Sequence, residues 1–205
     1  AVDSSVYRPA GLNVRRKEPF TILNVCWQRR TNLHRKMVLE LLEAFARFST
    51  EEKDSRLILA GPAEDGTALL KDRAEVLGVA ERVDFPGELT RTRKVEMLQG
   101  CSMYAQVSRY EGFGRATAEA LGCGAPVLVS RVGAVPEVIG DCGIYSSSLD
   151  VEGILNGIRD VHRDYAAALR RAEKGVERVH RLFSVERRRE DLRRFIDEVM
   201  SRRRG

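Results

Sequence analysis

The chain has 205 residues, of which 43% are hydrophobic and 32% charged, which excludes a disordered chain and suits one globular domain, or one with a helical appendage. No apolar run approaches the roughly 18 residues of a membrane-spanning helix, and the first residues lack the pattern of a signal peptide, so we expect a soluble cytoplasmic chain. The net charge of +5 favours an acidic partner.

The first nineteen residues carry turn residues such as Pro9 and Gly11 and show no hydrophobic periodicity. A segment of this kind is typical of a linker. We therefore expect an interdomain linker over residues 1–19 and a folded domain that begins near Phe20.

From Phe20 onward, short apolar runs alternate with patterns of helical period. The predicted strands are 20–26, 56–62, 82–87, 102–108, 125–130 and 142–147, and the predicted helices between them are 36–48, 68–77, 92–98 and one that begins near Gly114. Strands that are almost continuously apolar indicate a parallel sheet covered on both faces. The sequence therefore predicts an α/β fold, a doubly wound Rossmann-like sheet of about six strands, with ligands bound beyond the carboxyl ends of the strands.

After Ser148 the strand patterns end, and we expect helices over 150–161, 164–181 and 184–203, with Ser184 as the N-cap of the last one. The domain would thus cover residues 20–183, followed by a terminal helix over 184–205. This helix carries arginines at 187–189, 193, 194 and 202–204. Their alternation with acidic residues is typical of a solvated helix face. The alternative is a peripheral contact with an anionic membrane surface, and nucleic acid is disfavoured as a partner of these arginines.

The segment after the predicted strand 102–108 places a glycine-rich turn between two carboxylates. Gly112 and Gly114 precede a helix whose unpaired N–H groups would face an anion at the edge of the sheet. Glu111 and Glu119, eight positions apart, carry only acceptors when ionised, which suits vicinal hydroxyls of a sugar or a ribose. These residues favour a nucleotide or phosphorylated ligand over a merely structural turn.

Residues 108–145, SRYEGFGRATAEALGCGAPVLVSRVGAVPEVIGDCGIY, resemble the C-terminal, donor-binding domain of retaining glycosyltransferases of the GT-B fold, family 4 or group 1. Glu111 and Glu119 match the E-x7-E motif of that family. The resemblance covers nearly the whole chain, since VDSSVYRP is similar to the family's interdomain linker and FSVERRREDLRRFIDEVM to its terminal helix. It implies one half of a GT-B fold, and that the helix over 184–205 crosses to an N-terminal acceptor domain absent from this sequence.

The resemblance also implies roles for single residues. Glu111 would contact hydroxyls of the donor sugar, and Glu119 would hold the ribose. The residues that would line the sugar and the diphosphate are Gly112, Phe113, Gly114, Arg115 and Ala116. Gly87 and Glu88, in the loop after the third predicted strand, would lie where the family's backbone contacts the base.

The family uses an arginine and a lysine after the first strand to neutralise the diphosphate, without a metal. Arg30 and Lys36 have the expected separation here and are the predicted pair. The loop CWQRRTNLHRKM departs from the family pattern, however, so Arg29 could replace Arg30 and Arg35 could replace Lys36. Met37 stands where the family commonly has Gly or Asn.

The sequence therefore predicts the donor-binding domain of a glycosyltransferase that takes a sugar from a nucleoside-diphosphate sugar. A UDP- or GDP-linked donor is favoured, and an adenosine donor stays open. The resemblance implies that no cofactor and no metal are needed, and the metal-binding Asp-x-Asp motif is absent from the sequence. The absence of a P-loop and of a nucleophile elbow disfavours an NTPase and a hydrolase, and the four cysteines form no CxxC pair. The chain alone would be inactive without the acceptor domain. The alternative is a free-standing nucleotide-sugar binding module that performs no catalysis.

Overall fold

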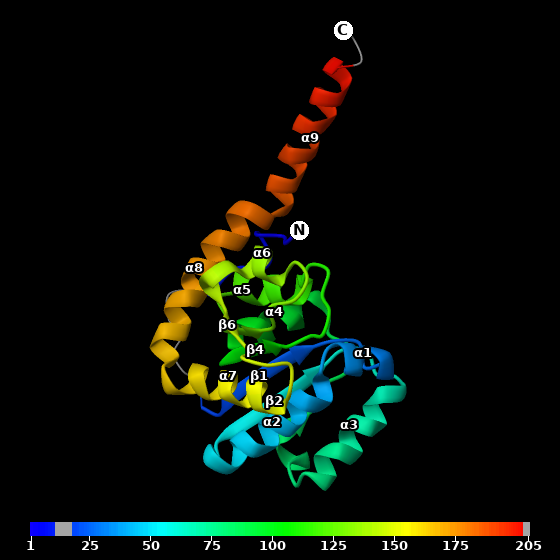
Figure 1. Ribbon diagram of the computed structural model, residues 1–205, viewed down its shortest axis with the longest axis vertical. Coiled ribbons are helices and arrows are strands. Elements are labelled where there is room, and N and C mark those ends of the chain that lie inside the picture. The colour runs from blue at the N-terminus through cyan, green and yellow to red at the C-terminus, as the bar shows by residue number, and fades with distance from the viewer. Residues whose placement is uncertain (11–17, 203–205) are drawn as a thin grey trace.

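Six short strands pair side by side, all in parallel, in the order β3-β2-β1-β4-β5-β6. A computed structural model describes residues 1–10 and 18–202 (Figure 1). The strands are β1 (Phe20–Val25), β2 (Ser55–Ala60), β3 (Val83–Asp84), β4 (Met103–Gln106), β5 (Val127–Val129) and β6 (Ile144–Tyr145). This order confirms the predicted doubly wound sheet, and it places the reversal of strand order between β1 and β4.

Helices alternate with the strands as the sequence predicts, except that α1 (Arg30–Arg35) and α6 (Val135–Ile139) are additional helices where loops were expected. They are α1 (Arg30–Arg35), α2 (Val38–Glu51), α3 (Asp65–Val76), α4 (Arg91–Gly100), α5 (Arg115–Gly122), α6 (Val135–Ile139), α7 (Val151–Arg163), α8 (Tyr165–Phe183) and α9 (Val185–Arg202), with short 3-10 turns at η1 (Ala80–Arg82) and η2 (Gly140–Cys142). The expected loop 27–36 contains α1, and the expected strand 82–87 shortens to β3.

Two apolar cores lie on opposite faces of the sheet, because successive strand residues point to opposite sides. Ile22 of β1 joins the core under α2 and α7, whereas the next residue, Leu23, joins the core under α5 and α8. Figure 1 shows α2, α3 and α7 on one side of the strands and α4, α5 and α6 on the other. The sheet is thus covered on both faces, and only its edges and strand ends remain for ligands.

The first residues of the chain pack onto the domain. Val2 and Tyr7 are buried, Val2 N–H donates to the Phe183 carbonyl at 2.8 Å, and the Val185 N–H donates to the Val2 carbonyl at 2.9 Å. Val2 of the expected linker is therefore attached to the junction of α8 and α9, and further along it the Tyr7 carbonyl contacts His180 of α8 and the Arg8 carbonyl accepts a hydrogen bond from Gln99 of α4. Burial of Val2 and Tyr7 stabilises this arrangement. The rest of that linker falls partly on residues 11–17, which lie outside the described residues.

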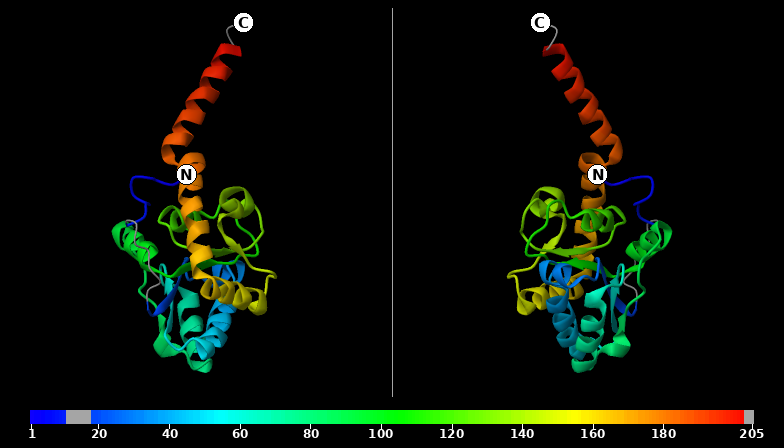
Figure 2. Two further views of the ribbon diagram at one scale, coloured as in Figure 1. Left: turned by 90° about the vertical axis from the view of Figure 1, so that its left-hand side faces the viewer. Right: turned by 90° about the vertical axis from the view of Figure 1, so that its right-hand side faces the viewer.

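Helix α9 leaves the body of the domain at Ser184, whose hydroxyl accepts a hydrogen bond from the Arg187 N–H at 3.1 Å and so acts as the predicted N-cap. The two side views in Figure 2 show α9 extending away from the sheet and its helices. Over the part of the chain that the structure describes, no helix is long and apolar enough to cross a membrane. Arg203 and Arg204 of the predicted basic patch lie outside that part.

Candidate functional site

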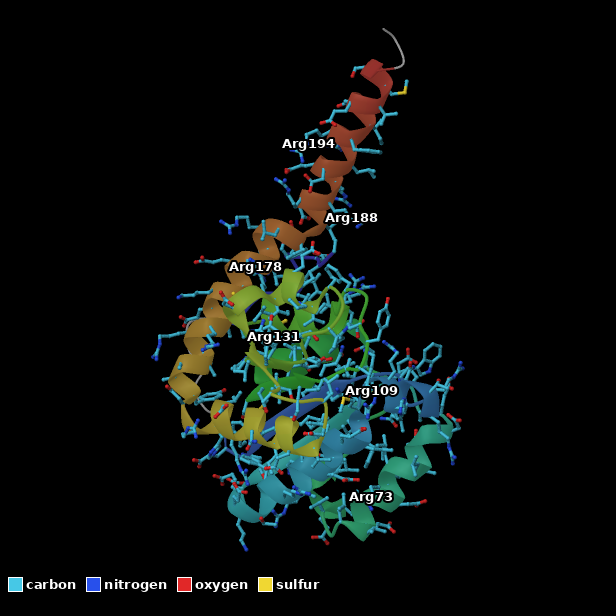
Figure 3. All side chains as sticks on the ribbon, in the orientation of Figure 1. Arg73, Arg109, Arg131, Arg178, Arg188 and Arg194 are labelled. Carbon is cyan, nitrogen blue, oxygen red and sulfur yellow. The ribbon has the colours of Figure 1, made fainter. Side chains whose placement is uncertain are left out.

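The loops that follow β1 and β4 meet at the carboxyl edge of the sheet, where the strand order reverses. The Arg109 N–H donates to the Arg35 carbonyl at 2.8 Å, and the Arg109 side chain pairs with Glu40 of α2 at 2.9 Å. Figure 3 shows Arg109 close to α1, far from Arg188 and Arg194 on α9. These contacts fix the segment that carries Glu111 against the segment that carries Lys36.

Glu111 is the acidic centre of this edge. The Lys36 Nζ lies 3.3 Å from Glu111 Oε2, and the Arg35 Nη1 lies 3.8 Å from the same oxygen. The side chains of Lys36 and Glu111 are each 14% exposed, so this pair is shielded more than an ordinary surface ion pair. The structure thus brings together two predicted site residues that are 75 positions apart.

The backbone around Glu111 is packed too tightly for another residue at Gly133. Gly133 has φ +51°, and a Cβ there would lie 2.0 Å from the Glu111 carbonyl oxygen. That carbonyl also accepts a hydrogen bond of 3.4 Å from the Ala134 N–H. The loop after β5 therefore fixes the main chain of Glu111.

Two residues that the sequence analysis missed complete the environment of Glu111. Gln106, 4% exposed, donates from Nε2 to Glu111 Oε2 at 3.0 Å, and the hydroxyl of buried Tyr104 donates to Gln106 Oε1 at 2.8 Å. The signal in the sequence was a glutamine inside an apolar strand, which has to find partners once it is buried.

Arg30 and Arg29 do not join this cluster. The Arg30 Nε donates to the Asp65 carbonyl at 3.4 Å, and Arg29 forms an ion pair of 2.8 Å with Glu64. Helix α1 places Arg30 in its first turn and Lys36 just beyond its last, so the two predicted cations lie at opposite ends of the helix. Arg35, which the sequence offered as the alternative to Lys36, lies beside Glu111 together with Lys36.

The predicted glycine-rich turn has the expected form. Gly114 adopts φ +75° as the N-cap of α5, so the helix begins at Arg115 and Ala116 as predicted. A Cβ at Gly112 would meet nothing within 4 Å among the described residues, which leaves open space beside the turn. Phe113, however, packs against Phe183 of α8, with ring centroids 5.8 Å apart, and so its side chain supports the fold here.

Glu119, on α5, is 1% exposed and forms ion pairs with two basic residues other than those beside Glu111. Its Oε1 pairs with the Arg115 Nε at 3.1 Å, and its Oε2 pairs with the ammonium of Lys94 on α4. Tyr7 lies alongside, and its burial together with the Glu119 carboxylate raises the pKa of Tyr7 to about 12. Since the Arg115 side chain is 74% exposed, it is the partner that a ligand can replace.

The loop after β3 closes the far end of the edge. The Gly87 carbonyl accepts a hydrogen bond of 2.8 Å from the Gly61 N–H, and a Cβ at Gly87, which has φ +74°, would meet nothing within 4 Å in the described structure. Glu88 is exposed beside it. There is therefore open space beside the backbone of Gly87.

Cys26 directly follows β1 and is buried, which leads to a prediction on thiol reactivity. Burial raises the pKa of Cys26 to about 11 and that of Cys123 to about 12, whereas Cys142 is only half-buried. A thiol of pKa 11 is only about one part in a thousand thiolate at pH 8. We expect iodoacetamide to label Cys142 first, and Cys26 at a rate that rises about tenfold per pH unit towards pH 11, measured by peptide mass spectrometry. Rapid labelling of Cys26 at pH 8 would contradict this.

Comparison with known proteins gives a consistent result. Residues 25–192 match the family described as glycosyl transferases group 1. Over 154 residues the chain is 30% identical to the N-acetyl-alpha-D-glucosaminyl L-malate synthase of Bacillus anthracis, an alignment that covers 74% of this chain and 39% of that protein. The chain therefore spans about two fifths of the length of this relative.

Two solved structures show the same fold. The sucrose-phosphate synthase of Thermosynechococcus elongatus superposes with a TM-score of 0.83 at 23% identity, over 98% of this chain and 51% of that chain. HepE of Anabaena, solved in complex with UDP and glucose, superposes with a TM-score of 0.75 at 23% identity, over 89% of this chain and 48% of that chain. Each match covers about half of the longer protein.

Proposed function

The chain belongs to the glycosyl transferases group 1 family, and we propose that it is the donor-binding half of an enzyme that transfers a sugar from a nucleoside-diphosphate sugar to an acceptor hydroxyl. One observation supports this most directly. Glu111 Oε2 is held by Lys36 and Gln106, whereas Glu111 Oε1 accepts no hydrogen bond among the described residues. An oriented carboxylate with one open oxygen, beside a cation and the open turn at Gly112, suits a hydroxylated ligand that carries a diphosphate.

In the proposed reaction the bond between the anomeric carbon and the diphosphate oxygen breaks, and the diphosphate keeps the electron pair. The acceptor oxygen bonds to the same face of the anomeric carbon, so configuration is retained, and its proton passes to the departing diphosphate. Lys36 and Arg35, together with the start of α5, would offset the charge that develops on the diphosphate. Metal independence is part of this proposal, because Lys36 and Arg35 would supply positive charge to the departing diphosphate.

The nucleotide would extend along the edge of the sheet. Glu119 would accept from the ribose hydroxyls once Arg115 moves aside, and the open backbone at Gly87 would contact the base. UDP is the first candidate, since HepE of Anabaena is solved with UDP and glucose, and GDP is the second. The sugar and the acceptor would be selected by the complete protein.

Helix α9 supports the proposal that a second domain completes the enzyme. Its apolar side chains are exposed, and they are Leu192, Phe195, Ile196, Val199 and Met200. Such a stripe on a helix that extends from the body is typical of a face that a partner covers. We propose that residues 184–205 cross to an N-terminal acceptor domain and that residues 1–19 link the two domains. An anionic membrane surface is the other proposed partner, although Arg187 and Arg194 are both paired with Asp191.

The proposal is tested first by calorimetric titration of this chain with UDP, GDP and ADP, and then with sugar nucleotides of the base that binds. We expect one diphosphate to bind clearly more tightly than the other two. Binding without transfer, even when the chain is combined with an acceptor domain, would favour the alternative of a binding module without catalysis. The absence of binding by all three nucleotides would overturn both readings for this chain.

The ribose role of Glu119 gives a sharper prediction. Glu119→Ala removes an acceptor of charge-assisted hydrogen bonds, so we expect nucleotide affinity to fall by about tenfold, or about 1.4 kcal/mol. A 2′,3′-dideoxy nucleotide should bind wild type and Glu119→Ala equally, because it lacks the hydroxyls that Glu119 would contact. This ligand is the control for a structural effect, since Glu119→Ala also leaves Lys94 without its partner. Equal losses for both nucleotides would contradict the ribose assignment.

A further inference from the structure

We propose that Gln106 is a positioning residue, which fixes the Glu111 carboxylate so that Oε1 faces the donor sugar while Lys36 is free to bind the diphosphate. The inference rests on the proposed function and deepens it. Gln106 is the last residue of β4, is 4% exposed, and donates from Nε2 to Glu111 Oε2 at 3.0 Å. Because Gln106 belongs to a central strand, the sheet fixes its backbone, and its side-chain amide contacts Tyr104 on one side and Glu111 on the other.

The orientation of the Gln106 amide is determined by Tyr104. The Tyr104 hydroxyl donates to Gln106 Oε1 at 2.8 Å, and Tyr104 is completely buried. Burial raises the pKa of Tyr104 well above its ordinary range, so the hydroxyl keeps its proton. The Val25 carbonyl, at 3.5 Å, is the more distant acceptor for that single proton. The amide oxygen therefore faces Tyr104, and the amide nitrogen faces Glu111.

Two donors of different character thus share Glu111 Oε2. Lys36 is charged and carries a flexible side chain, whereas Gln106 is neutral and buried. A bound diphosphate would attract the Lys36 ammonium away from Glu111. The Gln106 N–H would then remain as the donor that keeps Oε2 in place, and Oε1 would stay directed at the sugar.

A purely structural role for Gln106 makes a different prediction. If Gln106 served only as the partner of the Tyr104 hydroxyl, its replacement would lower stability without changing the preference between ligands. The quantity that separates the two roles is the ratio of the dissociation constants of the sugar nucleotide and the bare nucleoside diphosphate. That ratio cancels any loss that affects both ligands equally.

The test uses Gln106→Met and Gln106→Glu. Gln106→Met keeps the length of the side chain and removes both hydrogen bonds. Gln106→Glu keeps an acceptor for Tyr104 and, measured above the pH range in which two adjacent carboxyl groups share a proton, replaces the donor to Glu111 with a second carboxylate. We expect both variants to shift the ratio against the sugar nucleotide by about tenfold, with diphosphate affinity within about twofold of wild type. Tyr104→Phe should shift the ratio in the same direction, and should have no further effect in the Gln106→Met background.

The outcomes are distinguishable. If wild type binds no nucleotide, the proposed function fails and this inference with it. If wild type binds both ligands and Glu111→Ala shifts the ratio but Gln106→Met and Gln106→Glu leave it unchanged, the proposed function stands and the positioning role is wrong. A loss of stability with an unchanged ratio, measured by urea unfolding, would assign Gln106 to the core alone.

Discussion

Gly61→Ala is expected to destabilise the domain by at least about 4 kcal/mol, or to prevent folding. Gly61 follows β2 with φ +135°, a conformation that is essentially restricted to glycine. An added Cβ would lie 1.8 Å from the carbonyl oxygen of Cys26 and 2.6 Å from its carbonyl carbon. Both are backbone atoms at the end of β1, so neither can move without disturbing the strand pairing.

Backbone hydrogen bonds on both sides of Gly61 prevent a small backbone shift that would relieve this clash. The Cys26 N–H donates to the Ala60 carbonyl at 2.9 Å, and the Gly61 N–H donates to the Gly87 carbonyl at 2.8 Å. Gly61 therefore joins the carboxyl ends of β1, β2 and the loop after β3. A shift at this point would break hydrogen bonds at the edge where the candidate site lies.

Gly78→Ala is the matched control for this prediction. Gly78 also has positive φ, +69°, but a Cβ there would meet nothing within 4 Å in the described part of the chain. Its replacement should cost only about 1 kcal/mol, the penalty of a left-handed alanine. The free energy of unfolding from urea titration compares the two variants. Similar losses in both would show that the edge of the sheet can adjust, and would contradict the argument from the contact with Cys26.

Much of the fold could be predicted because its signals are local. Continuous apolar runs separated by helical periods define a parallel sheet, and the predicted N-cap Ser184 has the expected contact with Arg187. Helix α1 was missed because its residues are mostly polar and form no apolar stripe. The packing of Val2 and Tyr7 was missed for another reason, since two isolated apolar residues reveal nothing of the groove that buries them.

The candidate site could be predicted only in part. The proximity of Glu111 to Lys36 follows from the sheet order, because both residues come after strands that meet at the switch point. The loop after β1 contains helix α1, which the sequence did not predict, and this helix leaves Arg35 and Lys36 beside Glu111 and Arg30 at its other end. Buried Met37 has a left-handed backbone, with φ +48°. The family commonly has Gly or Asn at this position, and both adopt that conformation readily. A methionine gave no indication of a left-handed turn, so the sequence did not predict it.

Lys36→Met is expected to weaken nucleoside-diphosphate binding by about 100-fold, or about 2.7 kcal/mol, within the range for hydrogen bonds to charged groups. Lys36 is the most shielded cation beside Glu111, and shielding strengthens its attraction for a diphosphate. Its removal also takes a donor from Glu111 Oε2, so sugar-nucleotide affinity should fall at least as far. Calorimetric titration with the nucleoside diphosphate and with the sugar nucleotide measures both losses of affinity. Repeated at a second salt concentration, it should show that affinity depends less on salt in Lys36→Met than in wild type.

The matched variants are Arg35→Met and Arg30→Met. Arg35 lies 3.8 Å from Glu111, so its loss should be smaller than that of Lys36 but clear, about tenfold. Arg30 contacts the Asp65 carbonyl instead, and its replacement should change affinity by about twofold at most, as for an exposed charge. If Arg30→Met weakens binding as much as Lys36→Met, Arg30 must move into the site when the ligand binds. The pair predicted from the sequence, Arg30 and Lys36, would then replace the pair that the geometry favours, Arg35 and Lys36.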